Sequence, residues 1–114
     1  MLYELIRNMK GKLMLPKKVR VGHVIYKVVE KTGGEVISDE GEKCWGTCDY
    51  EKREIDIAVE TDAVQKRITL LHEIIHAIDW SMGYTLQEAE VHGLAIGLFG
   101  VLVENPKVAE YILG

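Results

Sequence analysis

The stretch LLHEIIHAIDW, residues 70–80, places two histidines four positions apart in an apolar run, with a glutamate directly after the first histidine. Residues four apart lie one turn above each other on the same face of an α-helix, so His72 and His76 can present a ring nitrogen to a single point. Glu73 points about a quarter turn away, too far round the helix to bind at that point. The stretch therefore predicts a helix that carries two metal ligands and a separate carboxylate.

The surrounding residues predict the length and packing of that helix. After Thr61 and Asp62, either of which can cap a helix, apolar residues recur at spacings of three or four, and Gly83 follows as a stop signal. We expect about twenty helical residues. The residues expected to face the core are Ile68, Leu71, Ile75, Ile78 and Met82. The two histidines run along the flank of this face, where unpartnered polar groups would cost on the order of a few kcal/mol that a bound metal offsets.

The chain before the helix predicts a small sheet. Residues 19–30 are rich in Val, Ile and Tyr and predict a strand, or a strand pair with a kink near Gly22. Residues 35–50 predict a short strand, a polar turn and a second strand entered at Lys43. Apolar and polar residues alternate in REIDIAVE, residues 53–60, as in a half-buried strand. Because the connections are short, an antiparallel meander is the simplest arrangement.

A second helix is expected after the motif helix. It begins after Thr85 and ends near Asn105 and Pro106, and the short segment 107–114 is apolar enough to dock on the domain. Its apolar face comprises Val91, Leu94, Ala95, Leu98 and Leu102. The length of 114 residues predicts a single domain, residues 1–114, of the α+β class. A sheet of three to four strands, antiparallel or mixed, is expected to pack on the two helices.

Composition excludes several classes of partner. The net charge is −4, and the basic residues are scattered apart from Lys17, Lys18 and Arg20, which we expect in a solvated loop, so the basic footprint of a nucleic-acid binder is missing. Charges interrupt the first 15 residues, so we expect no signal peptide there, and no apolar run is long enough to cross a membrane. We expect a cytoplasmic protein with no nucleic-acid or membrane partner.

Cysteines, tryptophans and one further acidic residue near the motif have simpler expected roles. Three residues separate Cys44 from Cys48, one more than in the redox motif, so two free thiols are expected, with a disulfide or a shared ligand role as the alternative. Trp45 and Trp80 are expected in the core or at a seam. Asp79 can accept a hydrogen bond from a ligating histidine or can be a solvated carboxylate.

A catalytic zinc site uses three protein ligands and keeps a fourth position for water, so the third ligand must come from another element. The second helix offers Glu88, Glu90 and His92. At 100° per residue, Glu88 lies about 50° from the centre of the apolar face, His92 about 90° and Glu90 about 110°, which favours Glu88. Glu90 and His92 stay alternatives, and His92 can also orient a ligand. Glu88 has a competing role, because Thr85-x-x-Glu88 fits a capping box.

The motif HEIIH at 72–76 and the pattern E-x-x-V-H-x-L-A at 88–95 resemble the small zinc peptidases of the gluzincin group. Within that group the chain is most similar to the short phage-type proteins related to the ImmA/IrrE peptidases and to the minimal scaffolds called minigluzincins. The resemblance covers roughly residues 19–106. It implies a zincin-like fold in which the glutamate of the family pattern E-x-x-A-N-x-F-A falls on Glu88, while His92 replaces the asparagine that supports a zinc-binding histidine.

The resemblance implies a zinc metalloendopeptidase that acts on a peptide or protein substrate. His72, His76 and Glu88 would hold Zn²⁺, and Glu73 would be the general base toward a metal-activated water. The strand at 53–59 would form the rim of the cleft, where an extended peptide adds as an extra strand.

The resemblance matches no residue that would stabilise the transition state, and Tyr84, Tyr111 and His23 are unranked candidates. The alternative function is a zinc-stabilised, weakly active or latent phage-type regulatory or binding protein. A latent protein would have its cleft covered by the apolar tail YILG or by another segment. The intact Glu73 favours the enzyme, because a structural site needs no base at that position. The natural substrate and the oligomeric state are not predicted.

Overall fold

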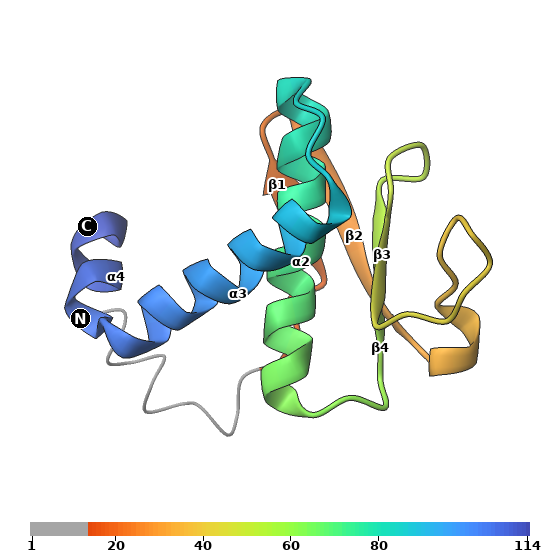
Figure 1. Cartoon of the computed structure of the whole chain (residues 1–114), viewed down its shortest axis with the longest axis horizontal. Coiled ribbons are helices and arrows are strands. Elements are labelled where there is room, and N and C mark those ends of the chain that lie inside the picture. The colour runs from red at the N-terminus through yellow and green to blue at the C-terminus, as the bar shows by residue number, and fades with distance from the viewer. Residues whose placement is uncertain (1–13) are drawn as a thin grey trace.

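The computed structural model describes residues 14–114, and Figure 1 shows a sheet beside a long central helix that a second helix crosses. The strands are β1 Lys18–Val21, β2 Val24–Lys31, β3 Gly46–Asp49 and β4 Glu54–Ala58, and the 3₁₀ turn η2 spans Gly33–Glu35. The helices are α2 Ala63–Met82, α3 Glu88–Glu104 and α4 Pro106–Leu113. The α+β class is confirmed. The expectation about a signal peptide falls mainly on residues 1–13, which lie outside the described residues.

The sheet is mixed, in the order β1-β2-β4-β3. β1 and β2 form the predicted strand pair, with Gly22 in the turn at φ 61°. β4 lies parallel to β2, with Val28 beside Ile55, and β3 pairs antiparallel with the other edge of β4. The predicted meander was therefore wrong. Ile55 and Ile57 are fully buried, so the more apolar strand takes the centre of the sheet and the short, polar β3 is left at the edge.

The chain between β2 and β3 is mostly irregular. A single bridge joins Ile37 to Lys43, so the strand pair predicted for residues 35–50 is reduced to this bridge before β3 begins. Between the bridged residues a tight polar turn forms, in which Ser38 N–H donates to the Glu42 carbonyl oxygen at 2.8 Å. The acidic residues and glycine of this turn have low strand propensity, which accounts for the missing strand.

Helix α2 begins and ends at the predicted signals. The Asp62 carboxylate accepts a hydrogen bond from Gln65 N–H at 2.8 Å. Gly83, at φ 73°, closes the other end by donating its N–H to the Asp79 carbonyl oxygen at 3.0 Å. The helix has 20 residues, as the pattern predicts. Across residues 14–114, none of the helices combines the length and hydropathy that a transmembrane span requires.

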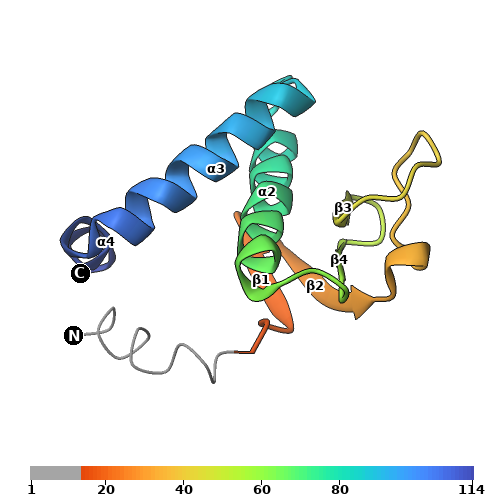
Figure 2. The ribbon, with the colours of Figure 1, turned by 60° about the horizontal axis from the view of Figure 1, so that its bottom comes forward.

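Helix α2 packs through two stripes and not through the single predicted face. Leu70, Ile74 and Ala77 pack on the sheet, and Leu71 and Ile75 pack on α3. Two stripes are needed because the sheet and α3 approach α2 from different sides (Figure 2). Ile78 and Met82, which were also predicted to face the core, are exposed.

Helix α3 is packed on α2 through its first half. Val91 and Ala95 are fully buried, whereas Leu94 and Leu98 of the predicted apolar face are exposed. Figures 1 and 2 show α3 running away from α2 toward α4, which contacts α3. The predicted docking of residues 107–114 is therefore a contact with the end of α3, and most of the tail stays exposed. The half of α3 that is held against α2 is the half that begins at Glu88.

Gly46 is expected to be essential to the close approach of β3 and α2. A Cβ at this position would lie 2.5 Å from Thr69 Cγ2, 3.1 Å from the Asp56 carbonyl oxygen and 3.2 Å from Glu73 Oε2. Gly46→Ala should therefore lower the free energy of unfolding by about 1–3 kcal/mol, measured by urea unfolding of the metal-free protein. Gly93→Ala is the control, because a Cβ there meets nothing within 4 Å, and it should stabilise α3 by about 0.5–1 kcal/mol. Equal effects of the two changes would contradict the tight packing.

Candidate metal centre

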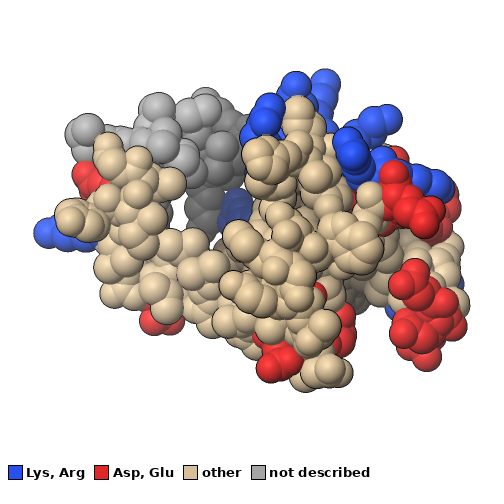
Figure 3. Space-filling model, turned by 90° about the horizontal axis from the view of Figure 1, so that it is seen from above, with Lys and Arg blue, Asp and Glu red and all other residues tan. Residues whose placement is uncertain are grey.

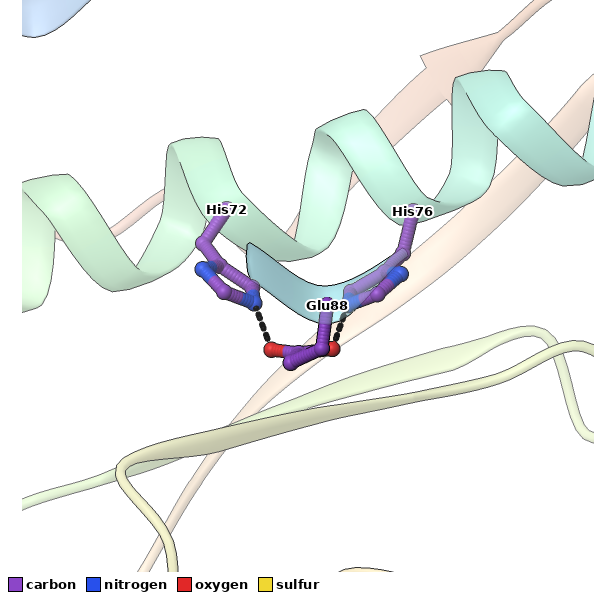
Figure 4. Close-up of side chains that lie close together, drawn as sticks. All are labelled: His72, His76 and Glu88. Carbon is purple, nitrogen blue, oxygen red and sulfur yellow. Dashed lines mark hydrogen bonds and ion pairs between the residues drawn. The ribbon is translucent and has the colours of Figure 1, made fainter. Parts of the chain in front are cut away.

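Helices α2 and α3 bring a carboxylate between the two motif histidines (Figure 4). His72 Nε2 lies 2.6 Å from Glu88 Oε1, and His76 Nε2 lies 2.9 Å from Glu88 Oε2. One potential ligand atom from each of the three side chains lies within 4.8 Å of the others. The residues predicted as metal ligands therefore come together in the fold, although His72 and Glu88 are 16 residues apart in the sequence.

The positions of the three side chains on their helices explain why they meet. His72 and His76 are one turn apart on α2, and their side chains are only 14% and 20% exposed. Glu88 is the first residue of α3, and its side chain extends from the helix end toward both rings. Asp79 Oδ1 accepts a hydrogen bond from Leu86 N–H at 3.3 Å. Asp79 therefore holds the connection between the helices while staying partly exposed, and no hydrogen bond joins its carboxylate to His72 or His76 among residues 14–114.

Glu90, the first alternative ligand, has a different partner. Its Oε1 atom accepts a hydrogen bond from Gln87 N–H at 2.8 Å, so this carboxylate caps the start of α3. The capping box predicted at Thr85 and Glu88 was wrong, because α3 begins two residues later than that box requires. The shift leaves the Glu88 carboxylate free to reach the histidines.

His92, the second alternative ligand, lies beside the cluster and outside it. Its ring centroid is 5.9 Å from that of His72, with the rings tilted by 60°. Burial lowers the pKa of His72, and the nearby Glu88 charge and hydrogen bond oppose this shift. A lowered pKa favours the neutral imidazole, which is the form that binds a metal.

Glu73 lies on the sheet side of α2 with 5% of its surface exposed. Burial raises the pKa of its carboxyl group to about 8, and the charge of Glu88 adds to the shift. No hydrogen bond joins this carboxyl to another described residue, although it borders two cavities. A carboxyl with this proton affinity can exchange a proton with a water molecule near neutral pH.

Two cavities meet at Glu73 and Glu88, which line both. The larger encloses about 370 Å³ on the His76 side, and the smaller about 180 Å³ on the His72 side. β3 borders both cavities, and only one of its edges is paired within residues 14–114. The strand at the rim is therefore β3, and the predicted rim at 53–59 was wrong, because β4 is paired along both edges.

Tyr50, which no sequence motif marks, lines the larger cavity. Its hydroxyl donates to the His76 carbonyl oxygen at 3.4 Å, and its ring stacks on Trp80 with centroids 4.5 Å apart. Burial raises the pKa of Tyr50 to about 12, so the hydroxyl stays protonated. The only sequence signal for this residue is its place directly after the edge strand.

The other aromatic residues and His23 are placed differently from the predictions. Tyr84, Tyr111 and His23 line neither cavity, so none of these candidates lies at the site. Trp45 and Trp80 are 55% and 63% exposed, and the prediction of core positions was therefore wrong. Both lie at the surface near the site, where Trp45 lines the smaller cavity.

The two cysteines and the basic residues near the start of β1 agree with the predictions in most respects. Cys44 and Cys48 are free thiols, as predicted. Burial raises the pKa of both, to about 12 for Cys48, so both stay protonated at neutral pH. Lys17, Lys18 and Arg20 are exposed, as predicted, although the last two belong to β1 and not to a loop.

Comparison with known proteins gave no match to this chain. A scan against protein-family models, a search of curated proteins and a search of solved structures each gave no match to the chain. Any functional assignment therefore depends on the geometry and the chemistry of the residues around His72, His76 and Glu88.

Replacing Glu88 tests the third ligand. Glu88→Ala removes the carboxylate that reaches both histidines, so zinc affinity should fall by more than about 100-fold, measured by competition with a chelating dye. Glu90→Ala is the matched control, because it removes a helix cap and should lower the free energy of unfolding by about 0.5–2 kcal/mol with zinc affinity unchanged. Loss of zinc affinity in Glu90→Ala but not in Glu88→Ala would move the assignment to Glu90.

The raised pKa of Glu73 predicts how the stability of the metal-free protein changes with pH. The folded group titrates near pH 8 and the unfolded group near 4.5. Below pH 4.5 the group is protonated in both states, and as the pH rises from 4.5 to about 8 the folded state loses stability, because the unfolded state releases its proton first. Glu73→Gln should therefore gain stability relative to the wild type across this range, measured by urea unfolding with a chelator present. A difference that is constant with pH would contradict the burial of an ionisable Glu73.

Proposed function

We propose that this chain is a zinc-dependent metallopeptidase of the small gluzincin type. The observation that carries the proposal is the Glu88 carboxylate, which reaches both His72 and His76 while the buried Glu73 carboxyl borders the same cavities. Two imidazole nitrogens and one carboxylate oxygen are a donor set of catalytic zinc sites. The cavities on either side leave room for a substrate at this centre.

The proposed chemistry combines an ion with a buried proton carrier. Zn²⁺ held by His72, His76 and Glu88 would polarise a carbonyl group and lower the pKa of a water molecule to about 7. In its ionised form, Glu73 would accept a proton from the water as the water oxygen adds to the peptide carbonyl carbon. The same carboxyl would then donate the proton to the leaving nitrogen as the C–N bond breaks. Its burial against β3 keeps this proton exchange away from bulk solvent.

The free edge of β3 supports the binding of an extended peptide. β3 pairs with β4 along one edge, its other edge is unpaired among residues 14–114, and its residues Gly46, Thr47 and Cys48 line the larger cavity. An extended substrate would hydrogen-bond to the backbone groups of that edge. Because Gly46 passes beside the Glu73 carboxyl, the reacting peptide bond would lie close to the base. The side chains on either side of that bond would then enter the two cavities.

Glu73→Gln is the central test of the proposal. The variant keeps all three proposed ligands, so it should bind close to one zinc ion per chain, measured by metal analysis. Cleavage of an unfolded protein by the zinc-loaded variant should fall by about 10²–10⁴-fold relative to the wild type, because the proton carrier is lost. Glu51→Gln, which changes an exposed carboxylate outside both cavities, is the matched control and should keep the wild-type rate.

Three outcomes separate the possibilities. Equal cleavage by the wild type and Glu73→Gln would exclude the proposed role of Glu73 and point to a contaminating protease. A purified protein that takes up no zinc would exclude the metal centre. Zinc binding without cleavage by either protein would favour a zinc-stabilised binding protein, since the ion then contributes folding energy alone.

A further inference from the structure

The two cavities at the candidate metal centre differ in charge. Apart from the shared Glu73 and Glu88, the charged residues of the larger cavity are Asp39, Glu40, Glu42 and Lys43. The smaller cavity has no charged residue beyond the shared pair, and its own lining includes Trp45, Ile68 and His92. In Figure 3, acidic side chains gather at the right, the side on which Figure 1 places the loop before β3.

The acidic loop is held in place at both ends. Ile37 and Lys43 form a bridge, and inside it Ser38 N–H donates to the Glu42 carbonyl oxygen at 2.8 Å. Glu42 N–H donates back to Ser38 Oγ at 3.2 Å, and Gly41 N–H donates to the Ser38 carbonyl oxygen at 2.9 Å. These bonds keep the three carboxylates at the rim of the larger cavity.

A separate observation concerns the place where the cavities join. Glu73 is 5% exposed, has no hydrogen-bond partner among the described residues and borders both cavities. A buried polar group without a partner is stabilised when a bound molecule supplies one. Any molecule that reaches this carboxyl therefore extends into the acidic cavity on one side and the uncharged cavity on the other.

We propose that the site selects peptides with a lysine or arginine on one side of the reacting bond and an apolar residue on the other. The basic side chain would lie in the larger cavity among Asp39, Glu40 and Glu42, and the apolar one would lie against Trp45 and Ile68 in the smaller cavity. This inference rests on the proposed peptidase function and specifies its substrate class.

The charge balance supports a measurable preference. Lys43 offsets one of the three loop carboxylates, which leaves an excess of negative charge on this side. Each exposed ion pair changes affinity by a few-fold, so two unbalanced carboxylates favour a cationic side chain by about five- to tenfold. The preference should shrink in high salt, because these carboxylates are exposed and salt screens their field.

Paired peptides test this proposal on the zinc-loaded full chain. Every peptide contains one leucine. The two peptides of a pair differ at one position, which is lysine in one and glutamine in the other, and this position is moved from pair to pair along the residues on both sides of the leucine. We expect kcat/KM to be about five- to tenfold higher with lysine on one side of the cleaved bond, with no preference on the other side. In the double variant Glu40→Gln/Glu42→Gln the ratio of the two rates should fall toward one. The control double variant Glu51→Gln/Glu104→Gln, outside both cavities, should keep the ratio.

Two results would overturn the proposal. One is equal kcat/KM for lysine and glutamine peptides at every position, and the other is a preference that persists in Glu40→Gln/Glu42→Gln. If no peptide is cleaved, the proposed peptidase function fails, and the charge preference of the larger cavity is then tested by binding. The same peptides, each carrying a fluorophore, are titrated with zinc-loaded Glu73→Gln. Tighter binding of the lysine peptides would support a preference of the larger cavity for basic side chains, and equal binding would exclude that preference.

Discussion

Helix α2 makes three kinds of contact, and the candidate site depends on how these divide its surface. One stripe of the helix packs on the sheet, a second packs on α3, and the motif histidines occupy the side between the two. Because α3 is held through Val91 and Ala95, the first residue of α3 is set at the level of the histidines. Apolar packing between two helices thus positions the Glu88 carboxylate.

The second constraint is the contact between α2 and the edge strand. Gly46 lets the β3 backbone approach Thr69 and Glu73, and this approach leaves the Glu73 side chain mostly buried, at the edge of the two cavities. Burial of an ionisable group without a partner opposes folding, and it also gives the group a proton affinity suited to exchange near neutral pH. The same contact therefore lowers stability and supports the proposed chemistry, as is common at catalytic sites.

Predictions from local signals agree with the structure where the interactions themselves are local. Asp62 and Gly83 bound α2 because a cap and a left-handed residue act within one turn of the helix. The histidine pair follows from the helical repeat, and the angle of Glu88 on its helix favoured it over Glu90 and His92. The predicted start of α3 was less accurate, because Thr85 and Gln87 can both precede a helix and packing selects between them.

By itself, the sequence determined the two main helices, a pair of imidazoles on one helix face and a carboxyl next to them, because the helical repeat sets all of these within a few residues. Only the tertiary structure decided the parallel pairing of β2 and β4, the place of β3 beside the two cavities and the two packing stripes of α2. It also decided that Tyr50 lines the larger cavity and bonds to the His76 carbonyl oxygen. These features depend on which distant segments meet, and that choice follows from the burial of the whole core, since no local pattern encodes it.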